Sequence, residues 1–257
     1  MKGIYIALSG AVAQERRLEL ISNNLANSNT VGYKADKLLF TTFLPITATQ
    51  VAERKILPDG TTSEDINPEV FDRAYVAVRE QLTDYSQGAI TLTGNNFDLA
   101  IEGKGFFVIN TPEGERYTRC GEFTVNKDGD LVTSNGHNVM GTNGKVTLPL
   151  NVDFNVLNDG TIRDGKAEIT KLKLVDFDDY SKLEKSGETY FKQSDNPAQV
   201  KALEDLKIRQ GFIENSNVNA IGNMVDMITT QRAYESYFKA ITTYDNITKK
   251  IIENASR

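Results

Sequence analysis

Residues 217–254 carry two apolar stripes at helical spacing and contain no proline. The spacings of three and four residues predict one long amphipathic helix. A single partner helix covers only one narrow seam, so two stripes indicate at least two neighbours. An N-terminal helix can supply one neighbour, and another molecule can supply the other. The stripes are Met224, Met227, Tyr234, Phe238 and Ile241, and Ala233, Tyr237, Ala240, Tyr244, Ile247 and Ile251.

A second amphipathic helix is expected from about residue 4 to residue 26, with a stripe of Ile4, Leu8, Ala11, Leu18, Ile21 and Leu25. It runs into residues 23–29, a stretch rich in asparagine, which is followed by Gly32. Asparagine and glycine favour helix C-caps and turns because both tolerate the left-handed conformation. The sequence therefore predicts a shaped helix exit, set by Leu25, Asn27, Gly32 and Tyr33.

Between about residues 70 and 211 the pattern changes to short apolar alternations separated by glycine-containing turns. Turn signals recur at 103–105, 127–129, 142–144 and 158–160, among other positions. This spacing is typical of an antiparallel β-domain and not of a parallel α/β sheet. Residues 46–68 are polar, with turn signals at 58–60 and 67–68, and are expected to form a loop or a loose hairpin.

The fold class predicted is α+β. The long N- and C-terminal helices are expected to pack together as a coiled-coil-like inner domain, and the central part of the chain is expected to form a mainly antiparallel β-domain. The expected division is 1–34 with 212–257 for the terminal helices, 35–84 for a connecting region and 85–211 for the β-domain. The residues expected to pack the helices or shape their exit are Leu18, Ile21, Leu25, Asn27, Gly32, Tyr33, Met224, Met227, Tyr234, Phe238, Ile241 and Tyr244.

Composition argues against several kinds of partner and site. A chain of 257 residues can bury a sizeable core, and its net charge of -6, with no basic patch, argues against nucleic acid. Its single cysteine, Cys120, excludes an intrachain disulfide and a cysteine-based metal site. No segment approaches the roughly 18 apolar residues of a membrane span. Residues 2–13 imitate a secretory signal, but the helical stripe continues past them, so no cleaved signal peptide is expected.

The chemistry-bearing residue types form no convincing catalytic or metal-binding pattern. His137 lies in a turn and no Gly-x-Ser-x-Gly elbow accompanies it. The acidic stretches 126–130 and 176–184 lack the loop spacing of a calcium-binding hand, and we interpret them as solvated turns. We therefore expect no cofactor and no metal. One enzymatic alternative stays open, a secreted β-rich carbohydrate hydrolase that uses two of the many carboxylates.

Four stretches, in order along the chain, carry motifs that are informative as a set. The first contains Leu25-Ala26-Asn27 and Thr30-x-Gly32-Tyr33-Lys34. The others are residues 85–107, beginning Tyr85-Ser86-Gln87-Gly88, residues 117–133, beginning Tyr117-Thr118-Arg119, and residues 211–235, which include Ile213-Glu214 and Gln231-Arg232-Ala233-Tyr234. Together they span nearly the whole chain. The four stretches resemble the bacterial flagellar rod, hook and related axial proteins, and the ordered set is much more specific than any one motif.

The resemblance implies a structural subunit of the flagellar basal body and no enzyme. Such a subunit is exported unfolded through the flagellar type III apparatus and joins a helical tube, with copies of itself and other rod subunits, that spans the periplasm and transmits torque from motor to hook. Residues 139–146 and 172–177 resemble the proximal-rod type more than the distal-rod type, which is the alternative. An adhesin or coiled-coil scaffold unrelated to motility is a further alternative.

Overall fold

A computed structural model describes residues 2–43, 75–149, 154–165, 167–194, 198–201 and 207–255. The turns expected at 58–60 and 67–68 lie outside the described residues. The chain divides into two compact units, one with residues 1–23, 36–82 and 221–257 and the other with residues 24–35 and 83–220. Each unit therefore combines segments that are distant in sequence.

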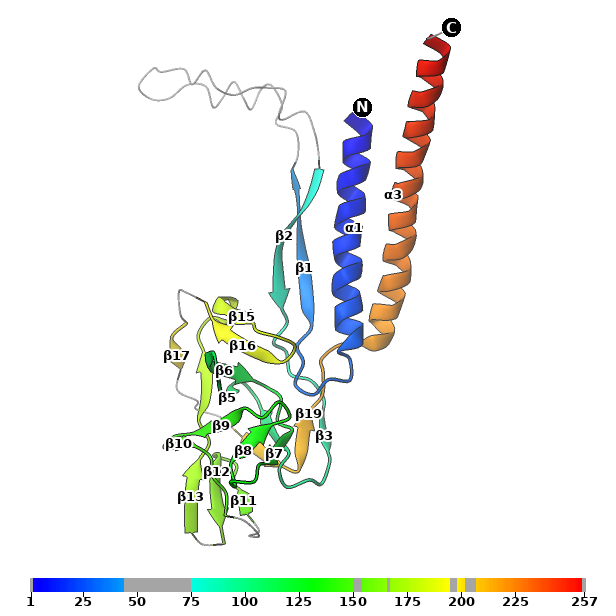
Figure 1. Cartoon of the computed structure of the whole chain (residues 1–257). Coiled ribbons are helices and arrows are strands. Elements are labelled where there is room, and N and C mark those ends of the chain that lie inside the picture. Colours follow the sequence, from blue (N-terminus) through cyan, green and yellow to red (C-terminus); the bar gives the residue numbers. More distant parts are fainter. Residues whose placement is uncertain are drawn as a thin grey trace, which may run out of the picture. The chain divides into compact units, whose positions relative to one another are not determined.

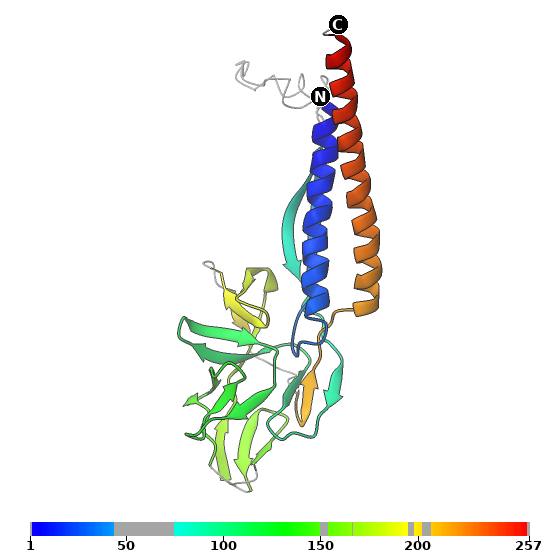
Figure 2. The same cartoon turned by 45° about the vertical axis from the view of Figure 1, so that its right-hand side comes forward.

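The first unit contains helices α1 (Lys2–Ala26) and α3 (Ala220–Ala255) and a two-stranded ribbon, β1 (Asp36–Phe43) with β2 (Tyr75–Thr83). The two helices run side by side, with the two chain termini at the same end (Figures 1 and 2). Both helices expected from the apolar periodicity are confirmed, because the expected ranges 4–26 and 217–254 nearly coincide with α1 and α3. Among the described residues, no helix is long and apolar enough to cross a membrane.

The two helices bury very different amounts of side chain. One face of α1 is buried and consists largely of small residues, Ala7, Gly10, Ala11 and Ala13, together with Ile21. Along α3, Thr230 is the one buried side chain in the range 220–254 for which burial is described. Most of the apolar surface of α3 is therefore not covered within the described part of the chain.

The second unit is built from short antiparallel strands, as the turn spacing predicted. Its largest sheet has the order β15-β16-β6-β5-β9-β8-β7, with β10 and β14 added beside β9 and β5 and β17 beside β14. A second sheet has the order β11-β12-β13, and two further pairs are β18 with β4 and β19 with β3. The strands are β3 (Ile90–Leu92), β4 (Leu99–Glu102), β5 (Phe106–Thr111), β6 (Gly114–Thr118), β7 (Phe123–Val125), β8 (Leu131–Thr133), β9 (Asn138–Gly141), β10 (Gly144–Lys145), β11 (Phe154–Val156), β12 (Thr161–Asp164), β13 (Ala167–Lys171), β14 (Leu174–Phe177), β15 (Leu183–Lys185), β16 (Tyr190–Gln193), β17 (Val200–Lys201), β18 (Lys207–Gln210) and β19 (Phe212–Glu214), with a 3-10 turn η2 (Tyr180–Lys182).

Strand β5 lies between two apolar cores of this unit. Phe107 and Ile109 belong to one core, and Phe106 and Val108 belong to the other. Successive side chains of a strand point to opposite faces, so a run of four apolar residues fills both cores at once. Aromatic rings dominate the second core, where Phe106 meets Phe177 and Phe191 with ring centroids 5.9 and 5.7 Å apart. The continuous apolar run is thus explained by a strand that is buried on both sides.

Candidate functional site

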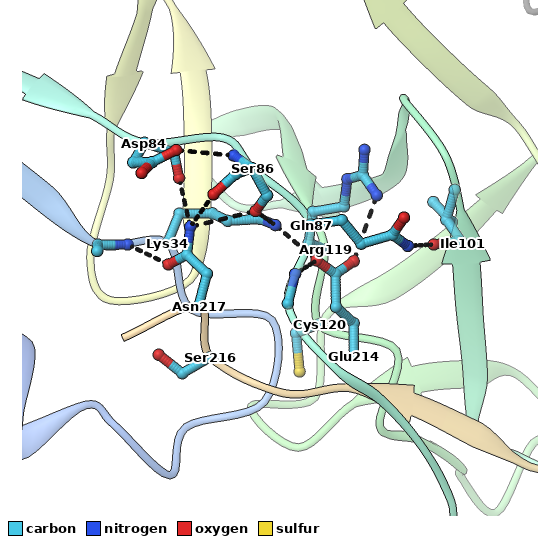
Figure 3. Close-up of polar contacts among 12 residues, drawn as sticks. Lys34, Asp84, Ser86, Gln87, Ile101, Arg119, Cys120, Glu214, Ser216 and Asn217 are labelled. Atoms are coloured by element: carbon cyan, nitrogen blue, oxygen red, sulfur yellow. Dashed lines mark hydrogen bonds and ion pairs between the residues drawn. The ribbon is translucent and has the colours of Figure 1, made fainter. Parts of the chain in front are cut away.

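A buried cluster of three charged side chains lies in the second unit (Figure 3). Glu214 binds Lys34 through Oε1, with an Nζ–Oε1 distance of 2.5 Å, and Arg119 through Oε2, with an Nη1–Oε2 distance of 3.3 Å. The side chains are only 1 to 4% exposed. Charged groups at this depth are rare unless they are paired, so the cluster marks a position where a polar contact has been kept inside the fold.

Three distant segments deliver these side chains. Lys34 follows the asparagine-rich exit of α1, Arg119 follows β6, and Glu214 is the last residue of β19. The stretch before β3 completes the shell, because Lys34 Nζ donates to Ser86 O at 2.7 Å and Gly88 N donates to Glu214 Oε1 at 2.9 Å. The cluster is therefore the meeting point of the N-terminal, central and C-terminal parts of the sequence.

The charges in the cluster do not balance. Burial lowers the pKa of the Lys34 ammonium, and the neighbouring Glu214 carboxylate opposes that shift. Burial likewise lowers the pKa of the Arg119 guanidinium. Arg119 Nε is buried and has no hydrogen-bond partner among the described residues. Two cations thus share one carboxylate, and removing that carboxylate would leave both of them inside the protein without it.

Gly32 brings the backbone close to the strands of the second unit. Its φ is +70°, and its N–H donates to Glu214 O at 2.7 Å. A Cβ at this position would lie 2.3 Å from Cys120 N and 2.5 Å from the carbonyl carbon of Arg119. Only glycine accommodates both the left-handed backbone and the close approach. Gly32 is among the residues that the sequence predicts to shape the helix exit.

Side chains around Gly32 hold the exit in place. Tyr33 is 1% exposed, and its hydroxyl donates to Asn24 Oδ1 at 3.1 Å. Thr30 Oγ1 donates to Asn27 Oδ1, also at 3.1 Å. Lys185 Nζ lies 4.3 Å from the centre of the Tyr33 ring and donates to the carbonyl oxygen of Lys34 at 2.7 Å. The asparagine-rich stretch is a defined polar structure and not an unstructured loop.

Asn217 connects the C-terminal segment to the same place. Its Oδ1 accepts the Ala35 N–H at 2.8 Å, and its Nδ2 donates to Asp84 O at 2.8 Å and to Ser86 O at 3.1 Å. One amide side chain thus satisfies backbone groups of two other segments. This bridging uses the donor and the acceptor of a single asparagine, which no apolar residue could replace.

The helical residues expected to pack lie in different environments within the first unit. Ile21 is buried, whereas Met224, Phe238 and Tyr244 are 50%, 54% and 47% exposed. The remaining ones are half-buried, namely Leu18, Met227, Tyr234 and Ile241 in this unit and Leu25 in the second unit. Tyr234 and Phe238 stack with ring centroids 6.2 Å apart. Their role in contacts between subunits remains a prediction.

The charged cluster was missed as a set. Lys34, Arg119, Glu214 and Asn217 all lie within motifs of the resemblance, but none was singled out as a site residue. The available signal was an acid and two bases inside otherwise apolar or turn-forming motifs. Sequence spacing alone does not bring them together, because Lys34 and Glu214 are separated by 180 residues.

The acidic stretches have structural roles that differ from the solvated turns expected. Asp130 is 4% exposed and accepts from Lys145 Nζ at 2.8 Å and from Thr147 Oγ1 at 2.7 Å. Asp176 is also buried and accepts from the Tyr180 hydroxyl at 2.6 Å. The interpretation as solvated turns was wrong for these two residues, because each fixes a neighbouring side chain. In the described ranges, no group of three or more His, Cys, Asp or Glu residues could hold a metal ion.

Three family models match this chain, and they do so in the three regions that meet at the cluster. A flagella basal body rod protein model matches residues 4–34, a flagellar hook protein FlgE/F/G D1 domain model matches residues 100–164, and a flagellar basal body rod FlgEFG protein C-terminal model matches residues 209–254. Lys34, Arg119 and Glu214 each fall in a different match.

Full-length relatives give the same result. The flagellar basal-body rod protein FlgF of Caulobacter vibrioides is 33% identical over 256 residues, covering 99% of this chain and 98% of the relative. The chain belongs to the flagellar basal-body rod protein family. The rod protein FlgG of Agrobacterium fabrum is 34% identical over 272 residues, with 99% of each chain covered, and FlgG of Bacillus subtilis is 29% identical over 265 residues, with 98% of each chain covered.

The rod family gives this protein a structural function. It is a subunit of the flagellar basal body, with the helix–β-domain–helix order that the motifs predicted. The matches to rod proteins give no support to the carbohydrate hydrolase considered from the carboxylates. The family recognised from the four motifs is confirmed.

Proposed function

We propose that this rod protein is a proximal-rod subunit that polymerises helically, with the terminal helices of neighbouring copies packed against one another. Such a subunit makes and breaks no bond in a substrate; it transmits torque through packed side chains. Head-to-tail contacts that do not close into a ring generate a helical tube, which is the symmetry that a rod requires. The partners are further copies and other rod subunits.

The observation that carries this proposal is the exposed apolar surface of the first unit. On α1, Tyr5, Leu8 and Val12 follow each other at helical spacing and are 47 to 54% exposed. On α3 the exposed apolar side chains extend along the helix and include Ile221, Met224, Val225, Ile228, Phe238, Tyr244, Ile247, Ile251 and Ile252. Exposed apolar surface of this kind is typical of protein interfaces and favours a protein that functions in an assembly over one that functions as a monomer.

The two helices also differ in length, which supports contacts beyond one chain. α3 has 36 residues and α1 has 25, so α3 is longer by 11 residues. At a rise of about 1.5 Å per residue this difference amounts to roughly 16 Å. Ile247 and Ile251 lie in the last part of α3 and stay about half or more exposed. These two isoleucines continue the stripe that runs through Tyr237, Ala240 and Tyr244. A helix of a neighbouring subunit would bury them.

A coiled-coil-like arrangement of α1 and α3 is the intramolecular part of the proposal. A Cβ at Gly10 of α1 would lie 2.6 Å from Cε1 of Tyr237 in α3. Small residues at a helix interface let two backbones approach closely. The buried alanines of α1 fit that role, and the alternation of four and three residues along α3 fits the same packing.

The proximal position is favoured over the distal one by residues 139–146 and 172–177, although relatives named FlgF and FlgG are similar to this chain at nearly equal identity. Export through the flagellar type III apparatus, without a cleaved signal peptide, and a rod that spans the periplasm complete the proposal. A tag on the β-domain, located in purified basal bodies by electron microscopy, tests the position. Label at the motor end supports the proximal type, and label at the hook end supports the distal type.

Ile247→Lys tests the helix surface, with Asn246→Lys on the same helix as the matched control. Both side chains are exposed, so neither substitution should change the thermal unfolding of the isolated chain. We expect Ile247→Lys to abolish incorporation into basal bodies and swimming, because it places a charge in an apolar contact. Asn246→Lys should assemble. Normal rods with Ile247→Lys would contradict the proposed contact surface.

A further inference from the structure

Glu214 is the carboxylate that both buried cations depend on. Glu214 makes ion pairs with Lys34 and with Arg119, at 2.5 and 3.3 Å. It comes from a segment 180 residues after Lys34 and 95 residues after Arg119. Placing Lys34 in its site without Glu214 would bury an ammonium group without its carboxylate, which is strongly unfavourable.

The backbone of the N-terminal segment depends on the same late part of the sequence. Gly32 N–H donates to Glu214 O at 2.7 Å, and Ala35 N–H donates to Asn217 Oδ1 at 2.8 Å. Gly32 is buried, so its N–H cannot simply turn to water while the segment keeps its place. The Lys34 ammonium group and the N–H groups of Gly32 and Ala35 therefore all have partners in residues 214–217.

The apolar cores of the same unit have no such dependence. The two cores are formed by residues between Tyr85 and Ile208, and neither contains a residue from 24–35 or from 214–217. The central β5–β6 hairpin pairs Phe107 with Thr118 and Thr111 with Gly114, which are local contacts. Local contacts form before distant ones because their loop-closure entropy is smaller. The largest core is closed by a distant pairing, that of β18 with β4, in which Ile208 lies opposite Ile101. That pairing contains no residue of either outer segment, so the β-domain core can form while residues 32–35 and 214–217 are still open.

We propose that the Glu214 cluster acts as a completion latch, in which residues 32–35 and 214–217 close onto the β-domain together as one unit. A chain is made from its N-terminus, so residues 32–35 appear long before Glu214. The N-terminal segment, and with it the exit of α1, then stays open until the C-terminal segment arrives. This order follows from the requirement that Lys34 and Gly32 be satisfied, and it holds for the isolated chain whatever its assembly partners are.

Native-state hydrogen exchange of the full-length chain in low denaturant tests the latch. The reporter amides are Gly32 and Ala35 in one segment and Asn215 in the other, with β5 amides such as Ile109 as the reference. We expect the three reporters to exchange with the same apparent opening constant and the same denaturant dependence, while Ile109 stays protected. If Gly32 and Ala35 remain protected under conditions in which Asn215 exchanges, the two segments open separately and the latch is overturned.

Glu214→Gln separates the charge from the shape of the side chain. The amide keeps an acceptor for Gly88 N–H but removes the negative charge that pairs with both buried cations. We expect exchange at Gly32, Ala35 and Asn215 to accelerate together by roughly 100-fold or more, with little change at Ile109. Glu102→Gln is the matched control, because it removes the carboxylate of an ion pair with Arg209 whose side chains are 39 and 47% exposed. An equal, small response to both substitutions would overturn the role of Glu214.

Discussion

Large apolar side chains are buried in the β-domain of this rod protein, whereas many of those on its terminal helices are exposed. Phe107 in β5 is fully buried, whereas Phe238 in α3 is 54% exposed. The β-domain covers its apolar side chains with its own strands and even buries charged ones, among them Lys34, Arg119 and Glu214. The helices leave apolar stripes uncovered on both α1 and α3. The second unit thus covers most of its apolar side chains itself, whereas the first unit exposes apolar surface of the kind that is typical of protein interfaces.

This contrast shows what an apolar stripe can and cannot say. Periodicity at three and four residues predicts a helix with an apolar face, but it does not say whose side chains cover that face. In the β-domain, the apolar run 106–109 is covered on both sides by the same chain. In α3, a comparable supply of apolar side chains is largely exposed. Substitutions that are matched between the two regions can therefore measure the difference.

The largest effect is expected for Gly32→Val, compared with Gly136→Val. Both glycines have positive φ, +70° and +80°, so both substitutions strain the backbone. A Cβ at Gly136 meets nothing within 4 Å, but at Gly32 it meets backbone atoms that cannot rotate away. We expect a loss of unfolding free energy of about 1–3 kcal/mol at Gly136 from strain, and about 2–6 kcal/mol at Gly32 from strain and overpacking together.

Denaturant unfolding of both variants, followed by circular dichroism, measures this difference. Equal losses at the two positions would show that backbone strain alone accounts for the need for glycine at Gly32. The close approach to Cys120 would then have no energetic weight. The exit of α1 would in that case resemble an ordinary surface turn and not part of the completed β-domain.

The next effect is Phe107→Ala compared with Phe238→Ala. Removing a buried phenylalanine leaves a cavity and costs about 3–5 kcal/mol. Removing an exposed one usually changes stability by less than about 0.5 kcal/mol. Urea unfolding of the monomeric chain should separate the two variants clearly. A loss of several kcal/mol for Phe238→Ala would mean that the face of α3 is already covered in the monomer, which would remove the contrast between the regions.

Sequence reasoning was most successful where structure depends on local pattern. The two helices, the antiparallel strands and the turn at Gly32 follow from periodicity and from the conformational freedom of glycine, which act over a few residues. The charged cluster could not be derived that way, because the pairing of Lys34 with Glu214 depends on how distant strands are arranged. The burial of Asp130 was missed for the same reason. Its partners, Lys145 and Thr147, lie on the other side of two turns.

A smaller loss of stability than for Phe107→Ala is expected when acid or alkali breaks the Asp130–Lys145 ion pair of the β-domain. A hydrogen bond from Lys145 lowers the pKa of Asp130 from its ordinary value of 3.8, and the same bond raises the pKa of Lys145 above 10.5. The pair stabilises the fold between these limits. Its contribution is lost as the pH falls through the lowered pKa of Asp130 and as it rises through the raised pKa of Lys145.

Thermal unfolding midpoints measured from acid to alkaline pH test this pair in wild type and Asp130→Asn. The variant should show a flatter profile at both ends, because neither group then titrates against the other. Glu188→Gln, an exposed carboxylate in another turn, serves as the control and should follow the wild-type profile. If the Asp130→Asn profile retains the full wild-type pH dependence, other groups determine the response.

The smallest effect tests whether α1 and α3 touch in the monomer at all. Gly10→Ala raises helix propensity, which alone should stabilise α1 by about 0.8–1.0 kcal/mol. In the wild type, the new methyl group must displace the Tyr237 ring, which lies 2.6 Å from the Cβ position, so the gain should be reduced or cancelled. In a Tyr237→Ala background the full gain should return. The difference between the two backgrounds is the interaction energy of a double-mutant cycle, measured by unfolding of the isolated chain. If Gly10→Ala stabilises both backgrounds equally, α1 and α3 do not pack against each other before assembly. The apolar surface left uncovered in the isolated chain would then include the surfaces that these two helices turn toward each other.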